Sequence, residues 1–148
     1  MRLFFAALAV CLAGPVAAGE IMVMDPYARA SRPGAPTGAV FMTLHNMGDT
    51  DDRLVGASTP VAQVTQIHTH IDDNGIMKMR EIEGGLPVAA GQMHELARGG
   101  DHVMLMGVTK DLVQGETIPL TLIFENAGVI TLDVPIDNKR GQGKAHKH

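Results

Sequence analysis

Turn-forming residues interrupt this chain so often that long helices are excluded over most of its length. After residue 20, short apolar, β-branched runs alternate with clusters of Gly, Pro, Asn and Asp, and helical periodicity is nearly absent. Runs of this kind are typical of strands in an antiparallel Greek-key sandwich or small barrel. We expect strands near residues 21–30, 38–46, 53–57, 61–71, 76–83, 92–97, 102–108, 117–125 and 129–136.

The segments between these strands are expected to be loops. Residues 31–36 are rich in Pro and Gly, and the charged residues 48–53 are interpreted as a solvated turn. Residues 111–113 are expected to form one helical turn. Residues 138–148 are rich in Lys, Gly and His and lack an apolar pattern, so we expect a disordered tail.

The first eighteen residues have the pattern of a secretory signal peptide. Arg2 precedes an apolar run, which is followed by small residues that form a cleavage site with Gly19 as the new N-terminus. The run is too short for a comfortable membrane span. Cys11 lies inside the run, directly after the bulky Val10, so we do not expect lipidation. The sequence therefore predicts export to the periplasm.

Cleavage would leave one domain of ordinary size at residues 19–137, followed by the tail. The whole chain has a net charge of −4, and a mildly acidic surface argues against nucleic acid and membrane partners. Cys11 is the only cysteine and would be removed with the leader. The mature chain would then have no disulfide, no thiolate metal site and no cysteine nucleophile.

Asn74-Gly75 is the strongest short hairpin signal in the sequence. If these two residues form the loop, His70 faces Met79 directly across the ladder, and His68 is the diagonal neighbour of Met79. His68, His70, Met77 and Met79 then project from one face of the hairpin. A slip of one residue would move Met79 to the other face.

A third expected strand contributes His102, Met104 and Met106, which share a face because strand side chains alternate. A single methionine at a strand position is usually core filler. The combination is harder to explain by packing, because a buried histidine without a partner is costly. Imidazoles with thioethers form a ligand set that suits Cu(I) better than magnesium, calcium or zinc.

The stretch from residue 66 to residue 125 resembles the periplasmic copper chaperone family PCu(A)C. The family signature is a His, ten residues, a Met, about twenty-one residues and then His-x-Met. Here ten residues separate His68 from Met79, twenty-two separate Met79 from His102, and Met104 completes the motif. The extra residue is expected in the turn at residues 83–86. The flanking sequences at residues 75–80, 105–107 and 119–122 match as well, whereas Asp101 stands where relatives are expected to have Tyr.

The resemblance implies a cupredoxin-like Greek-key β-sandwich with His68, Met79, His102 and Met104 as the Cu(I) ligands. It also implies a non-enzymatic metallochaperone whose partner is the copper-containing subunit of cytochrome c oxidase, or another copper-handling protein. A copper buffer without a dedicated recipient has the same ligand set and remains an alternative. An electron-transfer cupredoxin would need a cysteine ligand, and a copper enzyme would want a His-rich site without a soft majority. A sandwich whose Met and His only pack is the simplest alternative.

The remaining His and Met residues take lesser places in this interpretation. His70, Met77 and Met106 are candidates for supporting roles, His45 is interpreted as a strand-end residue and His94 as a surface residue. His146 and His148 in the tail would suit Cu(II), and Met22 and Met24 add soft donors near the mature N-terminus.

Overall fold

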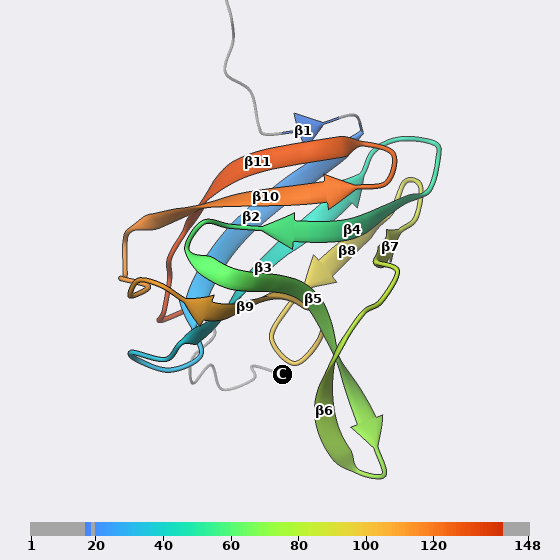
Figure 1. The fold of residues 1–148 in the computed structure, drawn as a ribbon. Helices are drawn as coiled ribbons and strands as arrows, with labels where there is room; N and C mark the ends of the chain where they lie inside the picture. Colours follow the sequence, from blue (N-terminus) through green and yellow to red (C-terminus); the bar gives the residue numbers. More distant parts are fainter. Residues whose placement is uncertain (1–16, 19, 141–148) are drawn as a thin grey trace, which may run out of the picture.

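A computed structural model describes residues 17–18 and 20–140, and its fold is all-β as expected (Figure 1). No helix occurs in these residues, so none of them belongs to a helix that could cross a membrane. The strands are β1 (Ala17–Ala18), β2 (Ile21–Ala30), β3 (Thr37–Asn46), β4 (Asp52–Ser58), β5 (Ala62–Asp73), β6 (Ile76–Glu81), β7 (Leu86–Val88), β8 (Met93–Leu96), β9 (His102–Val108), β10 (Thr117–Phe124) and β11 (Gly128–Pro135).

The strands form two antiparallel sheets that pack face to face as a sandwich (Figure 1). One sheet has the order β1-β2-β3-β9-β5-β6, with β8 added beside β3, and the other has the order β11-β10-β4-β7. The inward faces supply the core, because burial alternates along β3, β10 and β11. Fully buried core residues include Ile21, Val40, Leu44, Leu54, Val103, Leu105, Ile118, Leu120, Leu122 and Val134.

Side chains of the larger sheet that point away from the core form its outer face. On β3, Val40 and Leu44 are buried in the core, so Ala39, Phe41 and His45 belong to the outer face. The predicted metal ligands also lie on this outer face.

The hairpin of β5 and β6 has the register predicted from Asn74-Gly75. His70 pairs with Met79, and both loop residues have positive φ, 53° at Asn74 and 84° at Gly75. Asp72 accepts a hydrogen bond from the backbone N–H of Gly75 at 2.7 Å, which supports the turn. Among the strands that the structure describes, β6 pairs with β5 alone, and the hairpin end stands out from the sandwich (Figure 1).

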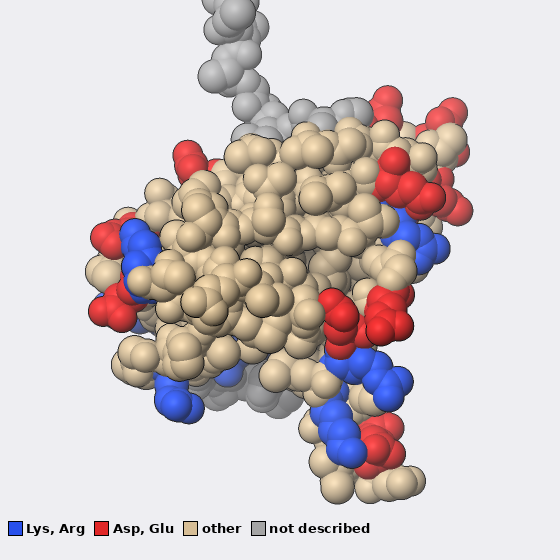
Figure 2. Space-filling model, viewed as in Figure 1, with Lys and Arg blue, Asp and Glu red and all other residues tan. Residues whose placement is uncertain are grey.

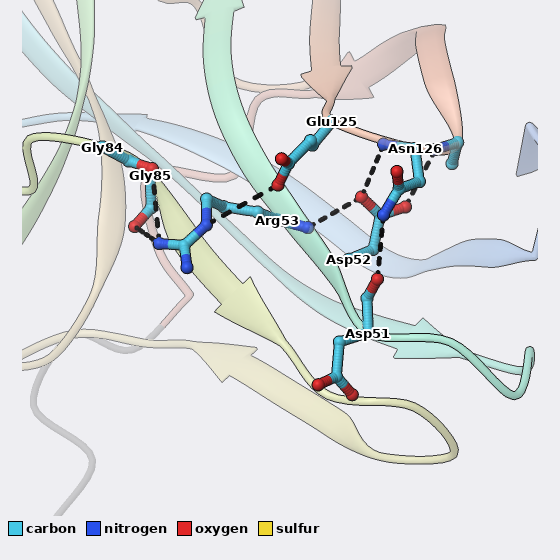
Figure 3. A network of polar contacts seen from close by, with 8 residues as sticks. Asp51, Asp52, Arg53, Gly84, Gly85, Glu125 and Asn126 are labelled. Carbon is cyan, nitrogen blue, oxygen red and sulfur yellow. Dashed lines mark hydrogen bonds and ion pairs between the residues drawn. The ribbon is translucent and has the colours of Figure 1, made fainter.

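The charged segment at residues 48–53 was expected to be a solvated turn, but part of it is buried and hydrogen-bonded to a distant turn. Asp52 is buried and accepts hydrogen bonds from the backbone N–H groups of Arg53, Asn126 and Ala127 at 2.7–2.9 Å. Figure 3 shows how this carboxylate ties the start of β4 to the turn between β10 and β11. Within the same network, Arg53 reaches the carbonyls at the turn before β7.

Two local predictions were wrong. Residues 111–113 are irregular rather than helical, and the buried side chain of Leu112 packs near Gly38. The tail was expected to begin at Asn138, but this residue bonds the backbone of Ala30 and Leu112. Arg140 stacks over the Tyr27 ring with 4.2 Å between its guanidinium carbon and the ring centroid. The ordered chain therefore extends at least to Arg140.

Charged side chains gather at the two ends of the sandwich and along the projecting hairpin, while the face over β10 and β4 is largely uncharged (Figure 2). The strand β7 was not expected, because three residues interrupted by Pro87 give too short a pattern to recognise.

Candidate metal centre

The order of the larger sheet brings three predicted ligand strands together. β9 lies between β3 and β5, and β6 follows on the far side of β5. His102 pairs directly with His68, and Met79 pairs directly with His70. Met104 pairs with Ala39 on one side and Gln66 on the other. Paired residues share a face, so all four predicted ligands lie on the outer face.

An open hollow of about 250 Å³ lies over this part of the outer face. Three of the four predicted ligands line it, namely Met79, His102 and Met104. The fourth, His68, is not part of the lining, and His70 takes part instead. His68 still borders the site, because its ring centroid lies 5.9 Å from that of His102. The His70 and His102 centroids are 5.4 Å apart.

The depth of the candidate ligands differs strongly. His102 is 3% exposed and Met104 is 9% exposed, whereas Met79 on the projecting hairpin is 51% exposed. Phe41 flanks the His102 ring with 6.1 Å between centroids. The site therefore has a buried side on β9 and an open side on β6.

A tight turn before β9 fixes the orientation of two imidazoles. The N–H of Gly100 donates to the carbonyl of Ala97 at 3.0 Å, and Gly99 has a φ of 84°. The carbonyl oxygen of Gly100 then accepts from Nδ1 of His70 at 3.0 Å and from Nδ1 of His102 at 3.1 Å. A carbonyl can only accept, so each Nδ1 carries the proton and each neutral ring keeps its lone pair at Nε2.

His68 has the opposite tautomer. Its Nε2 lies 2.8 Å from Oε1 of Gln66, an acceptor, so Nε2 carries the proton and Nδ1 carries the lone pair. That Nδ1 is buried and has no hydrogen-bond partner among the described residues. A buried nitrogen lone pair without a partner is costly in a dry protein and is suited to a metal ion.

Burial favours the neutral form of His68 and His102. Desolvation lowers the pKa of His102 below its usual range, against the opposing effect of its bond to Gly100. Desolvation also lowers the pKa of His68, partly offset by the carboxylate of Glu81. Neutral imidazole is the form that binds metal ions, so both rings are ready to ligate at neutral pH.

The donor atoms fit a soft monovalent metal. Nδ1 of His68 and Nε2 of His102 offer nitrogen lone pairs, and Met79 and Met104 offer thioether sulfurs. Thioethers and imidazoles favour Cu(I), whereas magnesium and calcium require oxygen ligands. The four candidate ligands include no carboxylate, so the ligand set itself has no negative charge of the kind that a divalent ion prefers.

Sequence reasoning missed several residues around the hollow. Arg29 and Arg98 line it, and Arg29 is buried although it is charged. Phe41 also lines it, on the strand next to β9. Strand alternation would have grouped Arg29 and Phe41 with the ligands if the strand order had been known, but the order does not follow from local patterns.

The other histidines and methionines have distinct environments. His94 was interpreted as an isolated surface residue, but its Nε2 lies 2.7 Å from the Asp101 carboxylate, and both side chains are partly buried. Met106 shares the outer face with Met104 but pairs with Thr37 and Val64, outside the hollow. Met77 is 59% exposed on the hairpin. His146 and His148 lie outside the described residues.

Comparison with known proteins identifies the family. The family model described as "LpqE-like: Putative lipoprotein LpqE-like" matches residues 21–136. This chain belongs to that family. The "Putative lipoprotein Lxx21020" of Leifsonia xyli subsp. xyli (strain CTCB07) is 31% identical over 130 residues, covering 88% of this chain and 77% of the relative. The "Uncharacterized protein RP573" of Rickettsia prowazekii (strain Madrid E) is 23% identical over 131 residues, covering 86% and 72%.

Solved structures confirm the resemblance to the PCu(A)C family and the cupredoxin-like fold. The copper-bound PCuAC domain from PmoF2 has 25% identity and a TM-score of 0.70, covering 85% of this chain and 99% of that domain. The apo PCuAC domain from PmoF1 has 29% identity and a TM-score of 0.69, covering 82% and 96%. The Cu(I) form of DR1885 from Deinococcus radiodurans has 32% identity and a TM-score of 0.62, covering 80% of each chain.

Proposed function

We propose that this protein is a periplasmic Cu(I) metallochaperone that holds one ion with His68, Met79, His102 and Met104. The single observation that carries this proposal is the buried Nδ1 of His68, which lacks a partner among the described residues beside the His102 ring. Core packing would leave this atom unsatisfied, whereas a metal ion would use its lone pair. The copper-bound state of related PCuAC domains supports the choice of metal.

The difference in depth between the ligands suggests how the ion would leave. His102 and Met104 would hold it from the buried side, and Met79 would close the open side. An incoming thiolate from a recipient protein would displace Met79 first, because only this ligand is half-exposed on a hairpin. The remaining ligands would then be exchanged one at a time, with no covalent bond of the protein broken.

The proposed recipient is the copper centre of cytochrome c oxidase, as the family resemblance implies. A copper buffer without a dedicated recipient is the second candidate, because binding alone does not distinguish the two. The Cu(I)-loaded protein is to be mixed with an apo oxidase copper domain and, separately, with an apo copper-efflux protein. Transfer to the oxidase domain alone supports delivery, and retention of copper in both mixtures supports the buffer.

Binding itself is tested by the His68→Gln variant, with His94→Gln as the matched control. Nδ1 of His68 is the partnerless atom, whereas His94 already has Asp101 as its partner. Loss of one Cu(I) equivalent only in His68→Gln supports the proposal. Equal copper binding by His68→Gln and the unmodified protein contradicts the ligand assignment.

Localisation in the periplasm rests on the leader at residues 1–18, and the lipoprotein descriptions of the relatives make Cys11 the rival processing site. Mass spectrometry of the exported protein separates the two. A mature chain that begins at Gly19 supports signal cleavage as proposed. A lipid-modified chain that begins at Cys11 contradicts it.

We also propose that His146 and His148 capture Cu(II), because imidazoles close together in the sequence suit this ion. Arg140 donates to Asp25 and lies over Tyr27, and its carbonyl accepts a hydrogen bond from Arg29, which lines the hollow. The described chain therefore ends beside the candidate centre. Loss of Cu(II) binding on His146→Ala/His148→Ala, with Cu(I) binding retained, is the expected result, and unchanged Cu(II) binding contradicts it.

A further inference from the structure

A second group of soft donors lies on the same outer face, away from the hollow. His45 on β3 pairs directly with Met22 on β2 and with Met93 on β8. The three residues therefore form one row across three adjacent strands. Directly paired residues have Cβ atoms about 4.5–5.5 Å apart, so both thioethers can reach the central imidazole.

The row belongs to the solvent side of the sheet. Leu44 and Asn46, the neighbours of His45 along β3, are buried on the opposite face. Met93 is 58% exposed, and Met22 and His45 are half-buried. A methionine that fills a core is buried, so packing does not account for Met93. The imidazole of His45 has no hydrogen bond or ion pair with any residue that the structure describes.

The backbone around the row is well supported. The N–H of Asn46 donates to the carbonyl of Gln92 at 3.0 Å, and the N–H of Met47 donates to the carbonyl of Glu20 at 2.8 Å. These bonds join the end of β3 to the segments that lead into β8 and β2. Strand positions with such support place side chains more accurately than loops do.

The row is distinct from the candidate centre. Phe41 lines the hollow and lies four residues before His45 on the same strand, about 13 Å away at ~3.3 Å per residue. One ion cannot be shared over that distance.

The neighbouring row on the same face contains Met24, Thr43 and Glu95, so an exposed carboxylate lies beside Met93.

We infer that Met22, His45 and Met93 form a second binding site for a soft monovalent metal ion, Cu(I) or Ag(I). Two thioethers and one imidazole give a three-coordinate soft set, which disfavours zinc and magnesium. The site should be weaker than the four-ligand centre, because it has one ligand fewer and is open to solvent. The chain would then bind two soft ions on one face.

Silver titration of the whole mature chain tests this inference, with the methionine methyl groups observed by NMR. The tail histidines are changed to alanine so that they do not compete. The first equivalent of Ag(I) should shift Met79 and Met104, and the second should shift Met22 and Met93 together. His45→Gln should weaken binding of the second equivalent at least tenfold and leave the first unchanged. Met47→Leu, an exposed methionine outside the row, and His94→Gln serve as controls that should leave both equivalents unchanged.

The outcomes separate this site from the proposed main centre. Met22 and Met93 shifts that are no larger than that of Met47 overturn the second site, whatever happens at Met79 and Met104. Unchanged second-equivalent binding in His45→Gln overturns it as well. Loss of the Met79 and Met104 shifts alone would contradict the main centre and leave the second site standing.

Discussion

Nδ1 of His70 and Nδ1 of His102 both donate to one carbonyl oxygen, that of Gly100, at 3.0 and 3.1 Å. The shared acceptor links β5 to the turn that precedes β9. Because both Nδ1 atoms bind this oxygen, both Nε2 lone pairs point away from the Gly100 carbonyl. Only His102 belongs to the proposed ligand set. We therefore expect His70 to hold the turn in place without binding the ion, and this difference in role can be measured.

His68→Gln and His70→Gln should have unequal effects on copper binding. Loss of a ligand at residue 68 should weaken Cu(I) affinity by more than about 100-fold, whereas loss of a supporting residue typically costs about 10- to 100-fold. Competition titration with a Cu(I) chelator measures both. A larger loss of Cu(I) affinity in His70→Gln would mean that His70 is the ligand and His68 the supporting residue. The lining of the hollow would then identify the ligand correctly, and the family motif would not.

Met104→Leu should separate copper binding from stability. The swap keeps volume and apolarity, so the buried site should lose less than about 1.5 kcal/mol of unfolding free energy. It removes the sulfur, so Cu(I) affinity should fall sharply. Met106→Leu is the control on the same face and should keep its affinity. Equal losses in the two variants would mean that the ligand set is larger than proposed.

Acid should weaken both copper binding and the fold of the metal-free protein. Desolvation lowers the pKa of His68 and His102, so in the folded protein both rings gain protons only below the ordinary histidine value of about 6.5. The unfolded chain binds these protons at higher pH than the folded chain does. The stabilising contribution is therefore complete above about pH 6.5 and is lost as the pH falls through the lowered pKa values.

Urea unfolding and Cu(I) competition at pH 5 to 7 measure these effects. The double variant His68→Gln/His102→Gln should flatten the pH dependence of the free energy of unfolding. Copper affinity that stays constant over this whole range would exclude imidazole as a ligand.

Asp52→Ala should destabilise the sandwich without affecting copper. Three backbone N–H groups would lose their acceptor, and we expect a loss of about 2–4 kcal/mol of unfolding free energy. Thermal or urea unfolding measures it. Asp49→Ala, in the exposed part of the same segment, should change stability by less than about 0.5 kcal/mol. A loss of similar size in both variants would contradict the structural role of Asp52.

Local patterns predicted most of the strands. They also predicted the hairpin register, because Asn74-Gly75 specifies one turn type and that turn places Met79 opposite His70. They did not predict the environment of Asp52, because its partners lie more than seventy residues away in the sequence. The same limit applies to the candidate centre. Strand alternation placed His102 and Met104 on one face, but the contact of His102 with Gly100 depends on the geometry of a glycine turn.

The pairing of His45 with two methionines also could not be predicted from the sequence. It requires β3 to lie between β2 and β8, and this neighbourhood comes from the sheet order rather than from any spacing in the sequence. His94 and Asp101 are a similar case, because Asp101 precedes β9 and strand alternation does not apply to it.

X-ray absorption spectroscopy of the protein loaded with one equivalent of Cu(I) tests the central claim most directly. The sample should carry His45→Gln, to remove the second site, and alanine in place of both tail histidines. We predict a monovalent edge with two nitrogen and two sulfur neighbours, and loss of one sulfur in Met104→Leu. A spectrum with nitrogen and oxygen neighbours only, unchanged by Met104→Leu, would contradict the assignment of this face as a Cu(I) centre.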